Sequence, residues 1–203
     1  MPRVDDYIAA CRLAREALAP VPCDRIRARS GLAFEGGRLK VPFLDRVYRV
    51  SCPGFEFADD VSADAPIPLQ EQVLLLHYLA ADAPVAVAGD WVAYREIPGA
   101  AFYFAAFVKR AVDPLKKRFG QDIAGFRQAA ARLNGAAVEA GDAAAEFRVL
   151  PNVPARLILH AGDEEFPPEA AILFDRSVGR ILTPEDVAWL AGMLVYRMMR
   201  VAG

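Results

Sequence analysis

The fold class is decided by residues 32–57, which read LAFEGGRLKVPFLDRVYRVSCPGFEF. Apolar and polar residues alternate in this segment, and the pair Gly36-Gly37 separates its first two runs. Two glycines between alternating runs are typical of the tight turn of a β-hairpin, because glycine adopts positive φ without strain. The runs at 46–50 and 55–57 continue the strand pattern. The segment therefore predicts an antiparallel meander.

The second half of the chain predicts another antiparallel group of strands. Residues 145–150 and 155–160 both read as strands, and the segment between them is short enough for a hairpin loop. Residues 91–95 and 172–174 read as two shorter strands.

The segments outside these strands repeat apolar residues with the period of a helix. A helix at residues 66–81 is apolar nearly all round, which is typical of a central helix. A helix that opens at Phe102 is expected to break near Pro114, and another covers residues 123–133. The N-terminal helix is predicted from one apolar stripe, made of Val4, Ile8, Cys11, Ala14 and Leu18.

The start of the last helix is the best defined boundary. Thr183 stands where an N-cap is expected, Pro184 follows at the first helical position, and acidic residues come next. Helices and strands occur in separate groups, which favours an α+β fold in which an antiparallel sheet (meander and hairpins) packs with about five helices. We expect a single α+β domain over residues 1–203, with residues 134–144 as the best candidate for a linker or hinge.

Composition excludes several classes of protein. Hydrophobic residues make up 55% and charged residues 25% of the 203 residues, which is an ordinary globular balance. No apolar run approaches the roughly 20 residues that span a bilayer, so we expect no membrane segment. A net charge of −2 gives no electrostatic basis for binding nucleic acid. The N-terminus lacks the features of a secretory signal, so we expect a cytoplasmic protein.

The three cysteines, Cys11, Cys23 and Cys52, are widely spaced, and no Cys-x-x-Cys occurs. This spacing argues against a disulfide framework, a zinc ribbon or an intrinsic iron–sulfur cluster. We expect the cysteines to be small apolar residues in or near the core. The sequence also contains no phosphate-binding loop, no dinucleotide-binding turn, no H-E-x-x-H and no G-x-S-x-G. No motif therefore assigns an enzymatic activity.

A first candidate site is for a cofactor, at His77, Trp91 and Tyr94. His77 lies on the predicted central helix among small and aliphatic neighbours, where an imidazole can ligate the iron or cobalt of a tetrapyrrole or corrinoid. The alternative is a buried imidazole bonded to a carboxylate or carbonyl. The aromatic residues between 91 and 107 would line an apolar pocket or simply pack in the core.

A second candidate site is for a divalent metal, at His160, Asp163, Glu165 and Asp175. His160 ends a predicted strand beside an acidic turn, and Asp175 ends the next strand and is expected to return to the same edge. Such a set would hold a metal or provide a general acid–base pair. The alternative is an ordinary exposed acidic loop.

Three alternating arginines suggest an anion clamp, with an ordinary solvated surface as the alternative. They are Arg25, Arg27 and Arg29.

Several stretches taken together resemble a known family. They are Phe43-Leu44 with Tyr48-Arg49-Val50, residues 75–79 (LLHYL), Trp91 with residues 95–99 (REIPG), residues 162–168 (GDEEFPP), residues 172–175 (ILFD) and residues 183–186 (TPED). In this order and spacing they resemble the domain-of-unknown-function family 3786, from about residue 25 to the end. Asp45 stands where that family is expected to have a glycine.

The resemblance implies a shared fold and a corrinoid or other metallocofactor context. The family occurs in anaerobic bacteria and archaea, and some members are fused to an iron–sulfur domain like that of corrinoid iron–sulfur proteins. No cysteine-rich segment of that kind occurs among the 203 residues. No catalytic residues are carried over from the family.

Three functional hypotheses follow. The first is a cofactor-binding or accessory protein that works with a corrinoid, tetrapyrrole or iron–sulfur partner in anaerobic metabolism. The second is a small metal-dependent hydrolase centred on His160 and the nearby carboxylates. The third is a protein–protein interaction module without a small ligand.

Overall fold

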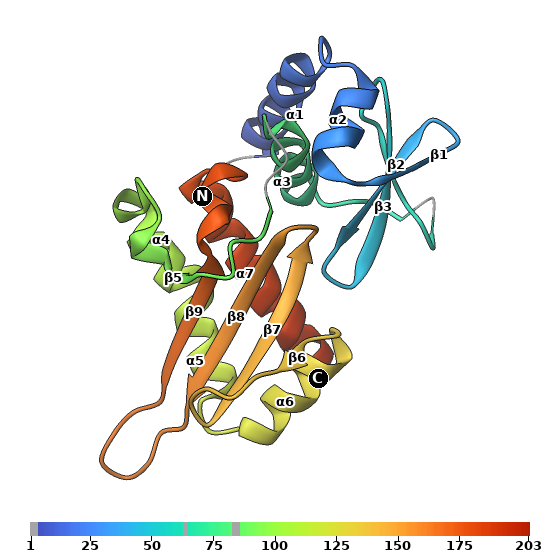
Figure 1. The fold of residues 1–203 in the computed structure, drawn as a ribbon. Coiled ribbons are helices and arrows are strands. Elements are labelled where there is room, and N and C mark those ends of the chain that lie inside the picture. Colours follow the sequence, from blue (N-terminus) through green and yellow to red (C-terminus); the bar gives the residue numbers. More distant parts are fainter. Residues whose placement is uncertain (1–3, 63–64, 83–85) are drawn as a thin grey trace. The chain divides into compact units, whose positions relative to one another are not determined.

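The computed structural model describes residues 4–62, 65–82 and 86–203. It shows an α+β protein with two antiparallel sheets, as the sequence predicts (Figure 1). The chain divides into two compact units: unit 1 comprises residues 1–86 and 180–182, and unit 2 comprises residues 87–179 and 183–203. Residues 1–3, on which the expectation about a secretory signal partly depends, lie outside the described residues. The single domain over 1–203 stays a prediction.

Unit 1 contains the predicted meander. Its strands are β1 (Ala33–Glu35), β2 (Arg38–Phe43), β3 (Arg46–Ser51) and β4 (Phe57–Asp59), and they are adjacent in chain order. The two-glycine turn pairs Glu35 with Arg38, with positive φ at both glycines. One face of the sheet is buried because its apolar residues alternate with polar ones; that face carries Leu39, Val41, Phe43, Tyr48 and Val50.

The helices of unit 1 are α1 (Val4–Leu18), α2 (Cys23–Ser30) and α3 (Leu69–Ala80). α3 is the central helix that the sequence predicts, and Glu71 on it is buried and accepts a hydrogen bond from the Tyr48 hydroxyl of β3. α1 packs on α3 through the later part of its apolar stripe. Val4 and Ile8, at the start of that stripe, are exposed, so the stripe prediction is wrong for the first turns.

α2 corrects the prediction of an anion clamp. In a helix, residues two apart point to nearly opposite sides, so three alternating arginines cannot all share one face. Arg25 and Arg27 are exposed, whereas Arg29 is buried and its Nη2 donates a hydrogen bond to the Leu79 carbonyl. Gly31 ends α2 with a φ of 67°, a conformation in which glycine is favoured.

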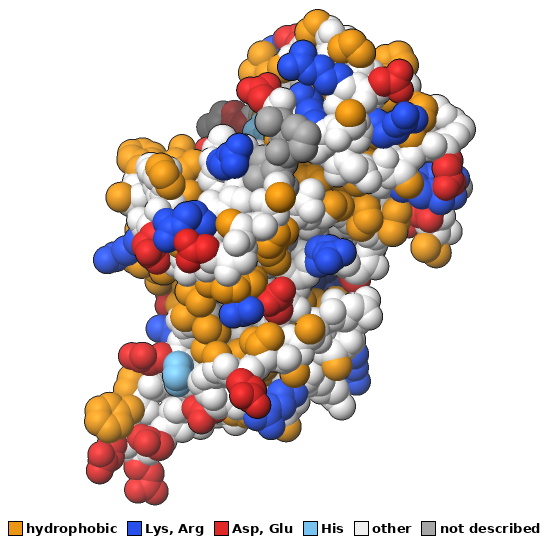
Figure 2. All heavy atoms as spheres, in the orientation of Figure 1, with side chains coloured by type: hydrophobic (Ala, Val, Ile, Leu, Met, Phe, Trp, Pro, Cys, Tyr) orange, Lys and Arg blue, Asp and Glu red, His pale blue; other side chains and the backbone are white. Residues whose placement is uncertain are grey.

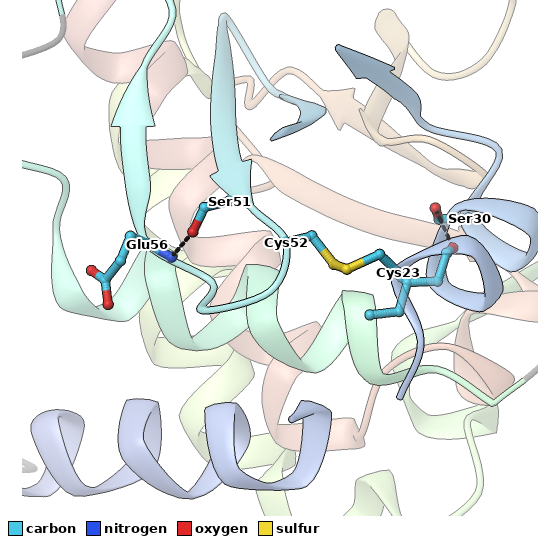
Figure 3. The surroundings of a disulfide bond; sticks show 6 residues. Cys23, Ser30, Ser51, Cys52 and Glu56 are labelled. Atoms are coloured by element: carbon cyan, nitrogen blue, oxygen red, sulfur yellow. Dashed lines mark hydrogen bonds between the residues drawn. A yellow bond between two sulfur atoms is a disulfide. The ribbon is translucent and has the colours of Figure 1, made fainter. Parts of the chain in front are cut away.

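A disulfide bond joins Cys23 of α2 to Cys52, the residue after β3 (Figure 3). The expectation that all three cysteines are unpaired core residues is therefore wrong for this pair. Two cysteines that are 29 residues apart in sequence come together because the meander returns β3 to α2, which spacing alone does not reveal. Cys11 is buried and not disulfide-bonded, as expected.

Unit 2 contains a five-stranded antiparallel sheet in the order β5-β9-β8-β7-β6. Its strands are β5 (Trp91–Ala93), β6 (Ala136–Ala137), β7 (Ala143–Leu150), β8 (Val153–His160) and β9 (Glu169–Asp175). The β7–β8 hairpin is confirmed. The linker prediction for residues 134–144 is wrong, because these residues form β6 and the approach to β7 inside unit 2. The boundary between the units falls near residue 86 instead.

Some helices of unit 2 cover one face of this sheet, behind the strands in Figure 1, and others lie beside its β5 edge. They include α4 (Phe104–Phe107), the π-helical turn η3 (Val108–Val112), α5 (Asp113–Phe119), α6 (Ile123–Arg132) and α7 (Pro184–Ala202), with short 3₁₀ turns η1 (Tyr94–Glu96), η2 (Ala100–Tyr103) and η4 (Arg176–Arg180). No described helix is both long enough and apolar enough to cross a bilayer.

Two helix ends show how sequence and structure agree and differ. Thr183 caps α7: its hydroxyl accepts the Asp186 backbone N–H, as the sequence predicts. The predicted break near Pro114 does not occur, and the helical path continues from α4 through η3 into α5. Pro114 lies in the first turn of α5, where its fixed φ suits a helix, and the wider π turn before it accommodates the missing N–H.

Candidate functional site

The candidate site is a pocket at the open edge of the unit 2 sheet. β5 covers β9 only at residues 173–175, so the edge of β9 at residues 170–172 lies beyond the end of β5. A pocket of about 450 Å³ borders this edge. That volume lies within the range of about 300–1,000 Å³ that is typical of small-molecule sites. Apart from Arg95, the side chains that line the pocket are apolar or aromatic: Ala93, Tyr94, Phe104, Phe107, Val108, Val112, Ala170, Ala171, Ile172 and Leu173.

Tyr94 forms a rigid part of the pocket wall. Its ring stacks on Phe107 with 4.2 Å between ring centroids and an interplanar angle of 4°. Its hydroxyl donates a hydrogen bond of 2.7 Å to the Pro184 carbonyl. Burial, together with the nearby Tyr103 and Glu185, raises the pKa of Tyr94 to about 12. Tyr94 therefore remains a neutral aromatic wall over the physiological pH range.

Arg95 supplies the positive charge at the pocket. Its Cζ lies 3.7 Å from the centroid of the Phe104 ring, so the guanidinium is held over an aromatic face. Arg95 is exposed, and no ion pair with a carboxylate is seen for it within residues 86–203. The pocket thus combines apolar walls with one cation that is available to an anion.

The backbone of β9 adds hydrogen-bonding groups along the same edge. Arg176 N–H donates to the Asp90 carbonyl, which extends the β5–β9 register by one pair. Backbone groups of an antiparallel strand point alternately to its two sides, so the N–H and C=O of Ala170 and Ile172 point away from β8. In the described part of the chain, no strand pairs with them on that side.

Trp91 lies next to the pocket on the face of the sheet that the unit 2 helices leave uncovered. The Arg156 guanidinium lies 3.9 Å from a Trp91 ring centroid and also forms an ion pair of 3.0 Å with Glu146. Figure 2 shows hydrophobic side chains gathered over β8 and β9 on this face. Trp91 is therefore held beside the pocket and does not line it.

The predicted cofactor residues are divided between the two units. Tyr94 lines the unit 2 pocket and Trp91 lies beside it. His77 lies on α3 of unit 1, where it is partly buried and has an interaction partner. The pocket is built from residues of unit 2 alone, so the geometry of a site that combines all three residues is not defined.

The predicted metal residues are not all brought together. His160 is the exposed last residue of β8 and lies opposite Glu169, whereas Asp175 lies opposite Trp91 at the other end of β9. Asp175 is six positions along the strand from Glu169, which is about 20 Å at 3.3 Å per residue. The prediction that Asp175 returns to the His160 edge is therefore wrong, because β9 runs away from that edge. Across the described ranges, no three His, Cys, Asp or Glu side chains are grouped to hold a metal.

Two of these carboxylates have structural hydrogen bonds. Asp163 accepts the backbone N–H groups of Phe166 and Glu165, and these bonds lower the pKa of Asp163. Asp175 is buried and accepts bonds from the Ser177 hydroxyl and from three backbone N–H groups, those of Ala88, Gly89 and Ser177. Burial opposes ionisation of Asp175, but the hydrogen bonds outweigh it and lower its pKa overall.

Sequence reasoning missed the features that make the pocket. Arg95 lies in a stretch shared with the family, but nothing in its sequence context indicates a binding role. Val108 and Val112 belong to a π turn that periodicity does not predict. The open edge of β9 follows from the shortness of β5, a signal that is visible in the sequence only after the pairing of β5 with β9 is known.

The fold and the site define the class of protein: an antiparallel α+β protein with an aromatic-walled pocket of the size of a small ligand. The chain belongs to the family described as Domain of unknown function (DUF3786), whose model matches residues 23–197. This confirms the resemblance seen in the sequence. No curated protein and no solved structure matches the chain.

Proposed function

We propose that the protein is a binding protein whose unit 2 pocket holds an apolar molecule with an anionic group. The observation that carries this proposal is the combination of a ligand-sized apolar pocket with Arg95, an exposed cation fixed over the Phe104 ring. A carboxylate or phosphate on the ligand would pair with Arg95, and the rest of the ligand would displace water from the walls.

Apolar burial provides most of the affinity in this proposal. Each 100 Å² of apolar surface removed from water contributes about 2.5 kcal/mol before the costs of association are subtracted. Tyr94 and Phe107 are already stacked and need no reordering to receive a ligand. Arg95 contributes selectivity between a carboxylate and its uncharged amide more than it contributes affinity.

The finer proposal concerns the identity of the ligand. A tetrapyrrole or corrinoid, the ligand suggested by the family resemblance, carries carboxylate or amide side chains around an apolar ring. One edge of such a ring would enter the pocket and place a side chain at Arg95. A corrinoid or iron–sulfur protein would be the partner that delivers or receives it, in the cytoplasm of an anaerobe. A metal-binding role for His77 is a separate proposal, which concerns unit 1 alone.

Titrations with a matched set of variants test this proposal. Haem and cobalamin are added and followed by absorbance, and benzoate and benzamide are added and followed by calorimetry. Val112→Trp fills the pocket and should abolish binding, whereas Ala105→Trp places the same side chain on an exposed part of α4 and should not. Arg95→Gln should weaken the binding of carboxylates and leave benzamide unaffected.

The role of His77 is resolved by the same titrations. If His77 ligates the metal, His77→Ala removes the spectral change on adding haem or cobalamin. If that variant binds and changes colour like the wild type, axial ligation by His77 is excluded while the pocket proposal stands. No binding of any of these ligands to the wild-type protein would exclude the pocket proposal itself.

A second candidate function, a protein interaction module, is favoured by the open edge of β9. The outward N–H and C=O groups of Ala170 and Ile172 match the backbone of an added strand, and the pocket beside them would take one of its side chains. Charge complementarity with Arg95 specifies a partner segment that is extended, apolar and carries an acidic residue.

Peptide display tests this second candidate directly. Selected peptides should be extended and apolar with one acidic residue, and Ala170→Pro should abolish their binding because it removes an outward N–H. Binding that is indifferent to Ala170→Pro, or the absence of any selected peptide, would argue against it. Light scattering after size exclusion shows whether a second copy of the chain occupies the edge.

A further inference from the structure

The disulfide of unit 1 joins two cysteines with different environments. Cys23 is the first residue of α2 and is partly exposed, whereas Cys52 is only 7% exposed in the turn that follows β3. Figure 3 shows the bond running from α2 to this turn. A thiolate from outside therefore reaches the sulfur of Cys23 more easily than that of Cys52.

The turn that carries Cys52 is held by bonds that do not involve the disulfide. The Cys52 N–H donates to the Gly37 carbonyl at 3.0 Å, and the Phe55 N–H donates to the Ser51 carbonyl. The Ser51 hydroxyl accepts the Glu56 N–H at 2.9 Å, as Figure 3 shows. Cys52 should therefore keep its position when the disulfide is reduced.

α2 is held less firmly than this turn. Only Ile26 and Arg29 of the helix are buried, and Pro22 at its N-cap position provides no side-chain cap. The Arg29 Nη2 bonds to the Leu79 carbonyl, but the buried Nε lacks a hydrogen-bond partner among the residues described. Burial lowers the pKa of Arg29, which reflects the same unfavourable environment. The docking of α2 thus depends on the disulfide more than the docking of the turn does.

We propose that Cys23–Cys52 is a thiol–disulfide exchange site for a protein dithiol, and that its reduction releases α2 from unit 1. The sequence predicts a cytoplasmic protein, and the disulfides that do form in that compartment are usually transient and have catalytic or redox-sensing roles. The proposal concerns unit 1 and does not depend on the ligand pocket of unit 2.

The exchange takes place in two steps. A thiolate of the partner attacks Cys23 Sγ, the new bond forms between these sulfurs, and Cys52 leaves with the electron pair and takes a proton from water. The second thiol of the partner, as thiolate, attacks the partner sulfur of this mixed disulfide and expels Cys23 as a thiolate. The uncapped N–H groups at the start of α2 stabilise that thiolate. The protein gains two electrons and one proton, with a second proton taken from water when the Cys23 thiolate is protonated, and the partner becomes a disulfide.

Single-cysteine variants test which of the two sulfurs is more accessible and reactive in thiol–disulfide exchange, as the assignment of Cys23 requires. In a Cys11→Ala background, Cys52→Ser leaves only Cys23 and Cys23→Ser leaves only Cys52. Under native conditions, Cys23 should form a mixed disulfide with glutathione disulfide or a thioredoxin-type protein at least about tenfold faster than Cys52. Circular dichroism confirms that both variants are folded. Equal rates, or faster reaction of Cys52, would overturn the assignment of Cys23 as the attacked residue.

Limited trypsin digestion tests the release of α2, since the helix offers cleavage after Arg25, Arg27 and Arg29. The Cys11→Ala protein is reduced by a thioredoxin-type dithiol without denaturant, and cleavage within α2 should become about tenfold faster than in the oxidised protein. Thiols counted in denaturant should rise from none to two. Three results would each contradict the proposal. The disulfide would open only when unit 1 unfolds, the cysteine pair would stay reduced under air or oxidised glutathione, or cleavage would be unchanged after reduction.

Discussion

Removing the disulfide should destabilise unit 1 by an amount that follows from its loop length. The bonded cysteines are 29 residues apart. The chain-entropy relation for a loop of this size gives about 12 cal/mol/K, which is about 3.6 kcal/mol at 25 °C. We therefore expect the Cys23→Ser/Cys52→Ser variant to lose about 3.6 kcal/mol of unfolding free energy in unit 1 relative to the oxidised protein.

The assay can separate the two units because both tryptophans, Trp91 and Trp189, lie in unit 2. Urea unfolding is followed by tryptophan fluorescence for unit 2 and by hydrogen exchange of unit 1 peptides. If the units unfold separately, only unit 1 should shift, whereas one cooperative domain would shift both signals together. This comparison also tests the prediction of a single domain over residues 1–203.

Two controls make the result interpretable. The reduced wild-type protein should match the double variant, because both lack the same covalent constraint. Cys11→Ala removes a buried sulfur without touching the disulfide and should cost about 1 kcal/mol. A loss in the double variant no larger than that of Cys11→Ala would refute the reasoning, since the constraint would then contribute nothing.

Three further predictions concern unit 2. Ala170→Pro should be tolerated, because the Ala170 N–H points away from β8. Ala171→Pro breaks the β8–β9 ladder and should lower the unfolding free energy in urea by more than about 2 kcal/mol. Equal losses for the two variants would refute the assigned register. Asp175→Asn should cost about 2 kcal/mol at neutral pH. Because the folded pKa of Asp175 lies below its ordinary value of 3.8, the carboxylate's contribution should be complete above that value and lost as pH falls through the folded pKa, whereas the Asn variant should lack this dependence. Thr183→Ala should cost about 1 kcal/mol by removing the α7 cap, and a thermal melt unchanged from wild type would contradict this.

Local signals in the sequence predict the elements of this fold well. The two-glycine turn at residues 36–37 specifies the first hairpin, and Thr183-Pro184 specifies the start of α7. Both depend on backbone conformations that only a few residue types favour, so they are visible without tertiary information. The α+β class follows from the same local patterns.

Features that depend on tertiary contacts were not predictable from one sequence. The short polar helix α2 has only Ile26 and Arg29 to bury, too few for a helical stripe, so its alternating arginines suggested a clamp. The partnership of Cys23 with Cys52 depends on where the meander ends. The boundary near residue 86 also has no local signal that distinguishes it from the Ala- and Gly-rich segment at residues 134–144.

The candidate site was predicted in part for the same reason. An aromatic group around Tyr94 was recognised because its members are close in sequence. The contribution of β9 was missed because it comes from residues about 75 positions later, through strand pairing. The metal set was grouped by closeness in sequence, although strand direction carries Asp175 away from His160.

The central claim is that unit 2 binds an anionic apolar ligand in its pocket. Chemical-shift mapping of the backbone amides by NMR tests this claim most directly. The 22.1 kDa chain is small enough for this measurement, with benzoate as probe and benzamide as its uncharged control. We predict that benzoate shifts the amides of residues 93–112 and 170–173, and that benzamide shifts the same amides except those around Arg95. Shifts confined to other surfaces, or none at saturating concentration, would contradict the claim.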